Sequence, residues 1–299
     1  MGSKKMQRVL ILGANGMLGR TLLLSILEFS DWEIAFTSRP GGFDTRLGSV
    51  MSRTSSFELD AEHPDKYHEA FLDFRPNWVI NCIGIVKQRV EANDPLICLR
   101  INSVFPHWVA GICEEIGAHL VHISTDCVFN GEQGPYKETD LANALDLYGK
   151  SKAMGEVISR RNALTLRTSI VGHEVNAQFG LLEWCLAQRG SIKGYKEAFF
   201  SGLTTTELSA IVCDLVNFGR RYSGLYHVAG PRIAKFDLLC LVNEVYGCGL
   251  KIEADSSLKI DRTLLSERWQ ALYNYKSPDW RKMLMTLANW KCKFEQYFV

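Results

Sequence analysis

A tyrosine and a lysine stand four residues apart in the stretch D-L-Y-G-K-S-K, from Asp146 to Lys152. Because four residues make just over one helical turn, Tyr148 and Lys152 would share one face of a helix. A tyrosine in water has a pKa near ~10 and is a poor acid at neutral pH. A lysine ammonium held nearby favours the phenolate and lowers that pKa, so the pair could be a proton donor with its tuning cation. The same spacing is common by chance on helix surfaces, and alone it does not decide.

A hydroxyl that would complete such a site lies in the stretch L-V-H-I-S-T-D-C-V-F. Ser124 and Thr125 stand at the carboxyl end of its predicted strand, where ligands bind in doubly wound sheets. A Thr125 hydroxyl aimed at the same substrate oxygen as Tyr148 would orient and stabilise a carbonyl group. A glycine turn lies upstream of this strand end. The three features together favour a catalytic tyrosine–lysine pair over a chance occurrence of the spacing.

Three glycines at G-x-x-G-x-x-G spacing follow the first apolar run, in V-L-I-L-G-A-N-G-M-L-G-R. Gly13 permits a tight turn, Gly16 lets a phosphate approach the backbone, and Gly19 lets the helix and the strand pack closely. The helix N-terminus carries partial positive charge, which favours a pyrophosphate there. The alternative is a plain strand–turn–helix with convenient glycines, but the strand before and the helix after favour dinucleotide binding.

The end of the second predicted strand, F-T-S-R-P, indicates which dinucleotide binds. An NAD site usually has a carboxylate there for the ribose hydroxyls, and this strand end has none. Ser38 and Arg39 could instead hold a 2′-phosphate, although an arginine here could also be a solvated loop residue. NADPH is therefore the preferred cofactor, with NADH as the alternative. Asp60, which ends the later stretch F-E-L-D, could bond the adenine amino group.

Short apolar runs alternate with helix-length segments along the first half of the chain. Strands are predicted at residues 9–12, 33–37, 78–82, 119–123, 164–167 and 224–228, and helices at 21–29, 104–116 and 181–189. The pattern predicts an α/β fold, a Rossmann-type doubly wound parallel sheet with a smaller C-terminal α/β substrate lobe. We expect residues 6–170, joined by some later segments, to form the dinucleotide-binding domain, and residues 171–299 to form mainly the substrate lobe. Thr206 is expected to cap a helix that follows Phe199.

The overall composition is that of an ordinary globular protein. The 299 residues are 46% hydrophobic with a net charge of +1, which argues against a dedicated nucleic-acid binder. Nine scattered cysteines show no metal-ligand spacing, nor do the histidines and carboxylates, so reduced thiols and no metal are expected. No apolar window approaches the roughly 20 residues of a membrane span, and no signal core follows the N-terminus. We therefore expect a soluble, cytoplasmic protein, with a homodimer as one option that stays open.

Six motifs, in order along the chain, carry a resemblance to a known family: G-A-N-G-M-L-G-R, V-I-N-C-I-G, S-T-D-C-V-F-N-G, P-Y-K-E-T-D, L-Y-G-K-S-K-A-M-G-E and L-R-T-S-I-V-G. On these motifs the chain resembles the extended short-chain dehydrogenase/reductases and, among them, the dTDP-4-dehydrorhamnose reductase family. The resemblance is strong from about residue 7 to 172. It is weaker afterwards, in G-L-Y-H-V-A-G, D-R-T-L-L-S and S-P-D-W.

The resemblance implies a role for each matching residue. The catalytic residues would be Thr125, Tyr148 and Lys152. The dinucleotide would contact Tyr148 and Lys152 and also Gly13, Asn15, Gly16, Met17, Leu18, Asp60, Cys82, Ile83 and Gly84. The sugar side would be lined by Ile85, Lys87, Thr125, Asp126 and Cys127. In the family, a hydride passes from nicotinamide C4 to the C4 keto carbon of a nucleotide-linked deoxysugar, and the tyrosine protonates the resulting oxyanion.

Two positions depart from the pattern of the family. The rhamnose enzymes usually have an aromatic residue where this chain has Cys127, and a tryptophan where it has Ile170. Two aromatic surfaces facing the sugar would be missing, so the rhamnose precursor need not be the substrate. Lys87 adds a charge at an expected pocket position, although a solvated lysine is an equal alternative. No histidine stands beside Cys127 in the sequence, so we interpret it as a small pocket residue rather than a nucleophile.

These features predict an NADPH-dependent oxidoreductase that reduces a nucleotide-linked 4-keto-deoxysugar in deoxysugar or polysaccharide biosynthesis. An epimerase or dehydratase on the same fold is one alternative. Dehydratases commonly read T-D-E where this chain has T-D-C, which weakens that option. A non-catalytic dinucleotide-binding regulatory subunit is the other alternative, because a fold does not fix a function. The presence of Thr125, Tyr148 and Lys152 together argues against it.

Overall fold

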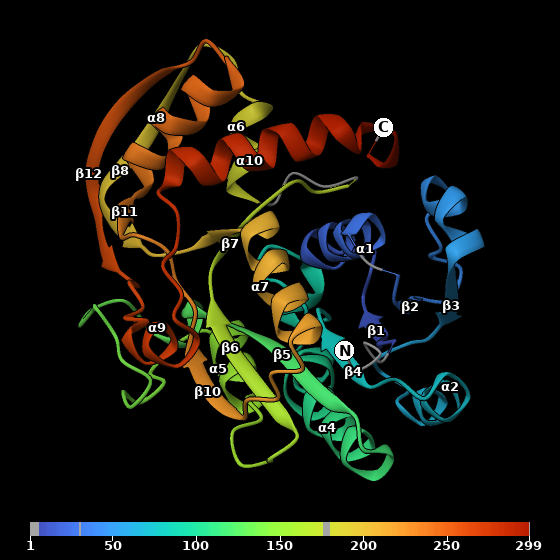
Figure 1. Cartoon of the computed structure of the whole chain (residues 1–299). Coiled ribbons are helices and arrows are strands. Elements are labelled where there is room, and N and C mark those ends of the chain that lie inside the picture. The colour runs from blue at the N-terminus through green and yellow to red at the C-terminus, as the bar shows by residue number, and fades with distance from the viewer. Residues whose placement is uncertain (1–5, 30, 176–179, 299) are drawn as a thin grey trace.

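The computed structural model describes residues 6–29, 31–175 and 180–298. At its centre lies a seven-stranded sheet whose neighbouring strands pair in parallel, in the order β10-β6-β5-β4-β1-β2-β3 (Figure 1). The strands are β1 (Arg8–Leu12), β2 (Glu33–Ser38), β3 (Thr54–Glu58), β4 (Trp78–Asn81), β5 (His119–Thr125), β6 (Ala163–Thr168) and β10 (Gly224–His227). The doubly wound parallel sheet predicted from the alternating pattern is confirmed.

The strand order reverses at β1. The chain runs outward through β2 and β3 and then crosses to the other side of β1 with β4. A ligand site is expected at the carboxyl ends of the strands that flank such a reversal. β4 and β6 are buried along their whole length, because helices cover both faces of the sheet.

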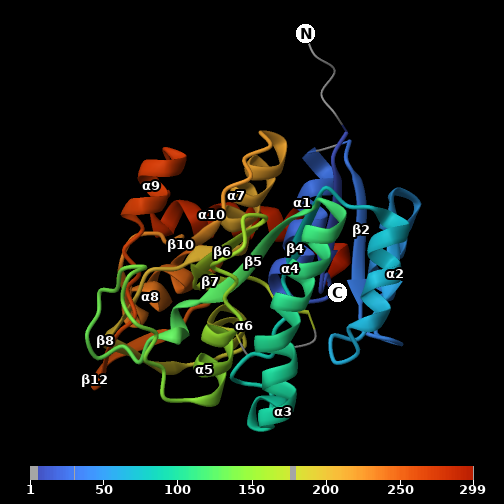
Figure 2. The same ribbon diagram turned by 90° about the horizontal axis from the view of Figure 1, so that it is seen from below.

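Helices cover the two faces of the sheet. α1 (Met17–Phe29) and α7 (Thr205–Asn217) pack together on one face, and α2 (Asp65–Phe74) and α4 (Phe105–Ile116) on the other. Figure 2 shows α2 alongside β2. α3 (Pro95–Cys98) and the π-helical turn η3 (Leu99–Val104) lead into α4, and α5 (Leu147–Met154) packs against η3. Short helices η1 (Thr45–Arg53), η2 (Val90–Asn93) and η4 (Asp126–Val128) lie beyond the carboxyl ends of β2, β4 and β5.

A smaller lobe is built on a second sheet, in which β8 (Ser191–Phe200) lies between β11 (Ile233–Ala234) and β12 (Lys251–Asp261). Next to it lie α6 (Leu181–Leu186), α8 (Lys235–Tyr246) and α10 (Trp280–Lys293), and β7 (Ile170–Val171) pairs with β9 (Leu203–Thr204). The last two helical elements in this part of the chain contact the main sheet and its loops: α9 (Glu267–Tyr273) packs on β10, and η5 (Glu295–Tyr297) contacts η1. The lobe is not a continuous half of the chain, because α7 and β10 lie with the main sheet. α10 packs on α7 and α8, and its C-terminal end reaches α1, where Lys293 pairs with Glu28 (Figure 1).

Two local features differ from expectation. Thr204, not Thr206, caps α7: its Oγ1 accepts a hydrogen bond from Glu207 N at 3.4 Å, and Thr206 lies inside the first turn. The prediction was wrong because the helix begins earlier than its apolar residues indicate. The second feature is the stretch Pro95–Ile116, which is long and apolar enough to cross a membrane by length and composition, contrary to the sequence prediction. Since 56% of its most apolar window is buried inside the protein, it has the burial of a core helix.

Candidate active site

The glycine turn joins β1 to α1, and two of its glycines leave no room for a side chain. Gly13 has a φ of +83°, and a Cβ there would lie 2.9 Å from Ile83 Cγ1. A Cβ at Gly19 would lie 2.2 Å from Gly13 O, so the helix and the turn could not pack. The Gly13 N–H donates to Thr37 Oγ1 at 3.0 Å, which ties the turn to β2. The first turn of α1 reads M-L-G-R, so no carboxylate opposes an anion at this helix N-terminus.

A cavity of about 400 Å³ lies beside this turn, at the carboxyl ends of β1, β2 and β4. Its walls bring together ten of the predicted residues: Gly13, Asn15, Gly16, Ser38, Arg39, Asp60, Cys82, Ile83, Gly84 and Ile85. Ile85, predicted for the sugar side, lies buried in this wall instead, with its N–H bonded to Asn102 Oδ1 at 2.9 Å. Met17 and Leu18 do not line the cavity; they form the first turn of α1, and Leu18 packs into the core.

Two buried polar atoms at this cavity have no hydrogen-bond partner among the described residues, Ser38 Oγ and Asn15 Oδ1. They are two of ten such atoms among the described residues, and both belong to residues of the cavity wall, where a polar ligand would supply a partner. Arg39 lies exposed at the cavity wall, and its guanidinium forms no ion pair with a carboxylate of the described chain. Ser38 and Arg39 can both donate hydrogen bonds, which suits a phosphate better than a bare ribose hydroxyl. The residues present therefore fit a phosphorylated dinucleotide.

Thr125 lies at the carboxyl end of β5, as predicted, and its hydroxyl is held in place there. Its Oγ1 accepts a hydrogen bond from Cys127 N at 3.1 Å and donates one to Asp126 Oδ1 at 3.2 Å. The side chain is only 8% exposed. The threonine therefore caps the short helix η4 and presents a fixed hydroxyl at the edge of the sheet.

α5 brings Tyr148 to the same strand end. Asp146 caps this helix, with Oδ1 accepting a hydrogen bond from Gly149 N at 2.9 Å. A Cβ at Gly149 would lie 2.3 Å from Cys127 O, so glycine allows α5 to approach η4 closely. Tyr148 is half-buried here and lies close enough to Thr125 for the threonine to influence the pKa of its hydroxyl. The two predicted side chains are therefore neighbours.

Lys152 lies one turn further along α5 and is 5% exposed. Its Nζ donates to Ile123 O at 2.8 Å and is 3.8 Å from the position that a Cβ on Gly84 would take. The ammonium thus stands between β5 and the part of the cavity wall that follows β4. Burial lowers the pKa of Lys152 to about 8, although the Glu156 carboxylate and Cys82 act in the opposite direction.

The pKa of Tyr148 differs from the prediction. The tyrosine–lysine pair predicts a lowered value, but burial raises the pKa of Tyr148, the Cys127 thiol beside it adds to the rise, and the contact with Thr125 opposes it. Desolvation of the phenolate dominates, and the Lys152 ammonium bonds to Ile123 O. Tyr148 is consequently protonated at neutral pH, which is the state that a proton donor needs.

Asp126 and Cys127 lie directly beyond Thr125, on the side predicted for the sugar. Burial raises the pKa of the Asp126 carboxyl, against the opposing charges of Arg262 and Lys235 from the lobe. Burial also raises the pKa of the Cys127 thiol to about 12, so it holds little thiolate at neutral pH and is a poor nucleophile. Among the described residues, no group of three or more histidines, cysteines and carboxylates could hold a metal ion.

Lys87 is engaged with the helix that carries Tyr148. Its Nζ pairs with Asp146 Oδ2 at 2.9 Å, and 54% of its side chain is exposed. Asp146 is the residue that caps α5, so Lys87 links the loop after β4 to the start of that helix. The structure thus places Lys87 next to the site through this ion pair.

Two residues missed by the sequence analysis support the site. Thr37, next to Ser38, holds the glycine turn and lines the cavity, and its place in F-T-S-R-P could have identified it. Asn102, in the π-helical turn η3, accepts a hydrogen bond from Ile85 N at 2.9 Å and donates one to Ser151 Oγ at 3.1 Å. It joins the cavity wall to α5. No local signal marks it, because both partners are distant in the sequence.

Comparison with known proteins places the chain in a family. The model of the RmlD substrate binding domain matches residues 6–290. The chain belongs to this family. The match extends over the main sheet and the smaller lobe, and it confirms the resemblance that the six motifs indicate.

The relatives that match this chain include a subunit of one enzyme and reductases of another kind. The methionine adenosyltransferase 2 subunit beta of Bos taurus is 30% identical over 172 residues, 56% of this chain, and the chain spans about half of that relative, 48%. The dTDP-4-dehydrorhamnose reductase of Aggregatibacter actinomycetemcomitans is 27% identical over 242 residues, 78% of this chain and 76% of that protein. The structure of dTDP-4-dehydrorhamnose reductase from Bacillus anthracis in complex with NADP has a TM-score of 0.78 at 21% identity, over 95% of this chain and 99% of that one. At that identity the structural likeness shows the shared fold.

Proposed function

We propose that the protein is an NADPH-dependent reductase of a nucleotide-linked 4-keto-deoxysugar. The observation that carries this proposal is the meeting of Thr125, Tyr148 and Lys152 at the ends of β5 and α5, next to the glycine turn and its cavity. A protein that only bound a dinucleotide would need the cavity but not a protonated tyrosine beside a threonine hydroxyl. The reductase from Aggregatibacter actinomycetemcomitans, which matches most of this chain, adds support.

The cavity would hold the adenosine half and the pyrophosphate of the dinucleotide. The pyrophosphate would lie on the first turn of α1, the 2′-phosphate at Ser38 and Arg39, and the adenine amino group at Asp60. The unpartnered Ser38 Oγ favours NADPH over NADH, and the related Bacillus anthracis structure contains NADP. When bound, the reduced nicotinamide supplies the hydride.

Three side chains would act on the substrate carbonyl. Thr125 would orient the oxygen by a hydrogen bond, and Tyr148 would give its proton to that oxygen as the carbon accepts the hydride, so that C=O becomes CH–OH. Lys152, held beside the Gly84 wall, would bond the nicotinamide ribose and stabilise the phenolate left on the tyrosine. Solvent would then return a proton to Tyr148.

The sugar would lie beyond Thr125, against Asp126 and Cys127 and near Lys87. Cys127 and Ile170 are smaller than the aromatic residues usual in rhamnose enzymes. A pocket with these two residues would admit a bulkier deoxysugar than one walled by two rings. We therefore propose a 4-keto-deoxysugar as the substrate class without restricting it to the rhamnose precursor.

The test is a screen of nucleotide-linked 4-keto sugars with NADPH, followed by the loss of absorbance of the reduced nicotinamide. The proposal predicts one NADPH oxidised for each sugar reduced. An epimerase or dehydratase would convert its sugar with no net consumption of dinucleotide. Tight NADPH binding without turnover of any such sugar would contradict the reductase proposal.

A regulatory subunit is the second candidate, and one finding favours it. The Bos taurus relative, 30% identical over 172 residues, is named as a subunit of methionine adenosyltransferase 2. Co-elution with a purified methionine adenosyltransferase, together with NADPH binding and no sugar turnover, would support this candidate over the reductase.

We also propose a cytoplasmic location. All nine cysteines are unpaired in the structure, and thiols stay reduced in the cytosol.

A stable homodimer would be detected by sedimentation of the purified protein.

A further inference from the structure

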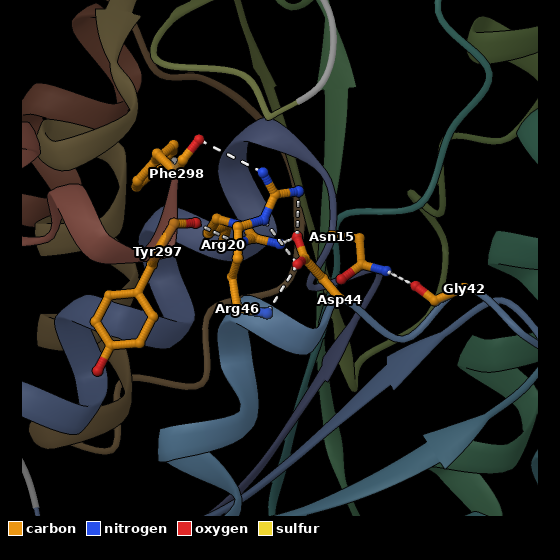
Figure 3. Close-up of polar contacts among 7 residues, drawn as sticks. All are labelled: Asn15, Arg20, Gly42, Asp44, Arg46, Tyr297 and Phe298. Carbon is orange, nitrogen blue, oxygen red and sulfur yellow. Dashed lines mark hydrogen bonds and ion pairs between the residues drawn. The ribbon is translucent and has the colours of Figure 1, made fainter.

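A buried arginine joins three segments that are far apart in the sequence (Figure 3). Arg20, in α1 directly after the glycine turn, is 1% exposed. Its guanidinium pairs with the Asp44 carboxylate and donates through Nη1 to Tyr297 O at 2.6 Å. The helix after the glycine turn, the loop after β2 and the C-terminal segment therefore meet at one side chain.

Asp44 fixes the loop after β2. Its Oδ1 accepts hydrogen bonds from Arg46 N at 3.1 Å and Arg46 Nε at 2.8 Å, and it caps η1. Burial would raise the pKa of the Asp44 carboxyl, but the hydrogen bonds from Arg46 and the charge of Arg20 lower it overall. One carboxylate is thus shared by two guanidiniums.

The same loop forms part of the cavity wall. Ser38, Arg39 and Gly42 line the cavity, and the Gly42 N–H donates to Arg39 O at 2.8 Å, which closes a turn. Asn15 Nδ2 donates to Gly42 O at 2.5 Å (Figure 3). The turn that would face the 2′-phosphate is consequently held on one side by Asn15 of the glycine turn. On the other side it is held by Asp44, two residues beyond Gly42.

The Asp44 carboxylate carries one negative charge, and the guanidiniums of Arg20 and Arg46 carry two positive charges. Residues 295–298, the C-terminal segment, supply further hydrogen-bond acceptors for these two guanidiniums. Tyr297 O accepts a hydrogen bond from Arg20, and Phe298 O accepts one from Arg46 Nη1 at 3.5 Å. Carbonyl oxygens at a buried guanidinium replace the water that it would otherwise need. This segment lies beyond residues 6–290, which the family model matches, whereas Arg20, Asp44 and Arg46 lie within them.

We infer that Arg20, Asp44, Arg46 and residues 295–298 form a clamp that positions the 2′-phosphate side of the dinucleotide site. Arg20 is a positioning residue in this clamp, because it acts through Asp44 on the turn that follows Ser38. The inference rests on the proposed dinucleotide function of the cavity. Loosening the clamp lowers the affinity for NADPH more than the affinity for NADH, since only NADPH uses that turn for a phosphate. Because coupling between sites is reciprocal, NADPH binding also stabilises residues 295–298.

The first test compares dissociation constants of NADPH and NADH, from fluorescence titration of the full-length protein and its Asp44→Asn variant. Asp44→Asn keeps the side-chain shape and removes the charge that both guanidiniums share. We expect the Kd for NADPH to rise about tenfold, a typical size for coupling between sites, and the Kd for NADH to rise less. Lys293→Met is the matched control. Lys293 ends α10, just before residues 295–298, and it pairs with Glu28 of α1 rather than with the loop that contains Asp44.

The second test needs no variant. Amide hydrogen exchange of residues 295–298 in the wild-type protein should slow when NADPH is added, although these residues lie outside the cavity wall. Three results would overturn the clamp. They are an unchanged NADPH affinity in Asp44→Asn, an equal loss of affinity for NADPH and NADH, and an amide exchange rate at residues 295–298 that does not change when NADPH is added. Failure of the wild-type protein to bind either dinucleotide would instead overturn the proposed function of the cavity.

Discussion

The half of the site around the cavity is lined by the ends of neighbouring strands, whereas the half beyond Thr125 draws on η4, the cap of α5 and the lobe. In the cavity half, the backbone decides the geometry, because Gly13 and Gly19 leave no space for a Cβ. In the half predicted for the sugar, side chains determine the geometry. The buried Asp126 carboxyl, for example, lies near the positive charges of Arg262 and Lys235. On the proposed function, backbone shape would hold the dinucleotide, and side chains that can be replaced would hold the sugar.

This difference predicts where substitutions act most strongly. Backbone crowding cannot be relieved by a rotamer change, so a substitution in the glycine turn should remove dinucleotide binding. A side chain on the sugar side can be replaced without moving the main chain, so its loss should alter affinity for the sugar and leave the dinucleotide bound.

The largest effect is expected for Gly19→Ala. The added Cβ would lie 2.2 Å from Gly13 O, and overpacking of this kind costs about 1–3 kcal/mol or more. NADPH binding, measured by titration, should be lost. Gly111→Ala in α4 is the control. Apart from its chain neighbours and the backbone of its own helix, no described atom lies within 4 Å of the Cβ that would be added there. Wild-type affinity in Gly19→Ala would show that the turn does not hold the dinucleotide.

Arg39→Ala tests the cavity half at a side chain. The loss of a charge-assisted hydrogen bond to the 2′-phosphate should weaken NADPH binding about tenfold and leave NADH binding nearly unchanged. Arg53→Ala, at another exposed arginine of the same region, serves as the control. An equal loss for both dinucleotides would rule out a 2′-phosphate role for Arg39.

The pH dependence should reveal Lys152, where the two halves meet. Its pKa is lowered from 10.5 to about 8, so the ammonium is present below that pH and is lost above it. The value of kcat/KM should therefore fall about tenfold per unit above pH ~8. Stability changes in the opposite sense: between about pH 8 and 10.5 the unfolded state binds more protons, so the contribution of Lys152 to the free energy of unfolding rises with pH. A rate that stays flat across this window would contradict a charged Lys152 in the reaction.

The smallest effect is expected for Lys87→Met, on the sugar side. A half-exposed ion pair such as Lys87–Asp146 contributes about 0–1 kcal/mol, so KM for the sugar should change by no more than about fivefold. NADPH affinity should not change. Lys150→Met, at an exposed lysine of α5, is the control. A large loss of NADPH affinity in Lys87→Met would place this lysine in the cavity half.

The cavity half could be predicted from the sequence because its signals are local. The three glycines and the stretch F-T-S-R-P each lie within a few residues, and each stands at the carboxyl end of a strand of the parallel sheet. Gly13, Ser38 and Gly84 accordingly line one cavity. The motifs of the family added Cys82 and Ile83, which no local rule singles out.

The remainder depended on contacts that only folding creates. The position of Ile85 is set by Asn102, and the raised pKa of Tyr148 comes from burial that a helical spacing does not reveal. The pairing of Arg20 with Tyr297 joins residues near the two ends of the chain, so no motif contains it. Short-range patterns thus identified the chemistry, and long-range packing determined its environment.

The central claim is that Tyr148 donates the proton beside Thr125 at the edge of the dinucleotide cavity. Tyr148→Phe removes only the hydroxyl, so NADPH affinity should stay close to the wild-type value. With a nucleotide-linked 4-keto sugar that the wild-type protein reduces, the rate of NADPH oxidation should fall by about 10²–10⁴-fold, the usual range for a positioned proton donor. NADPH oxidation by this variant at the wild-type rate would contradict the claim.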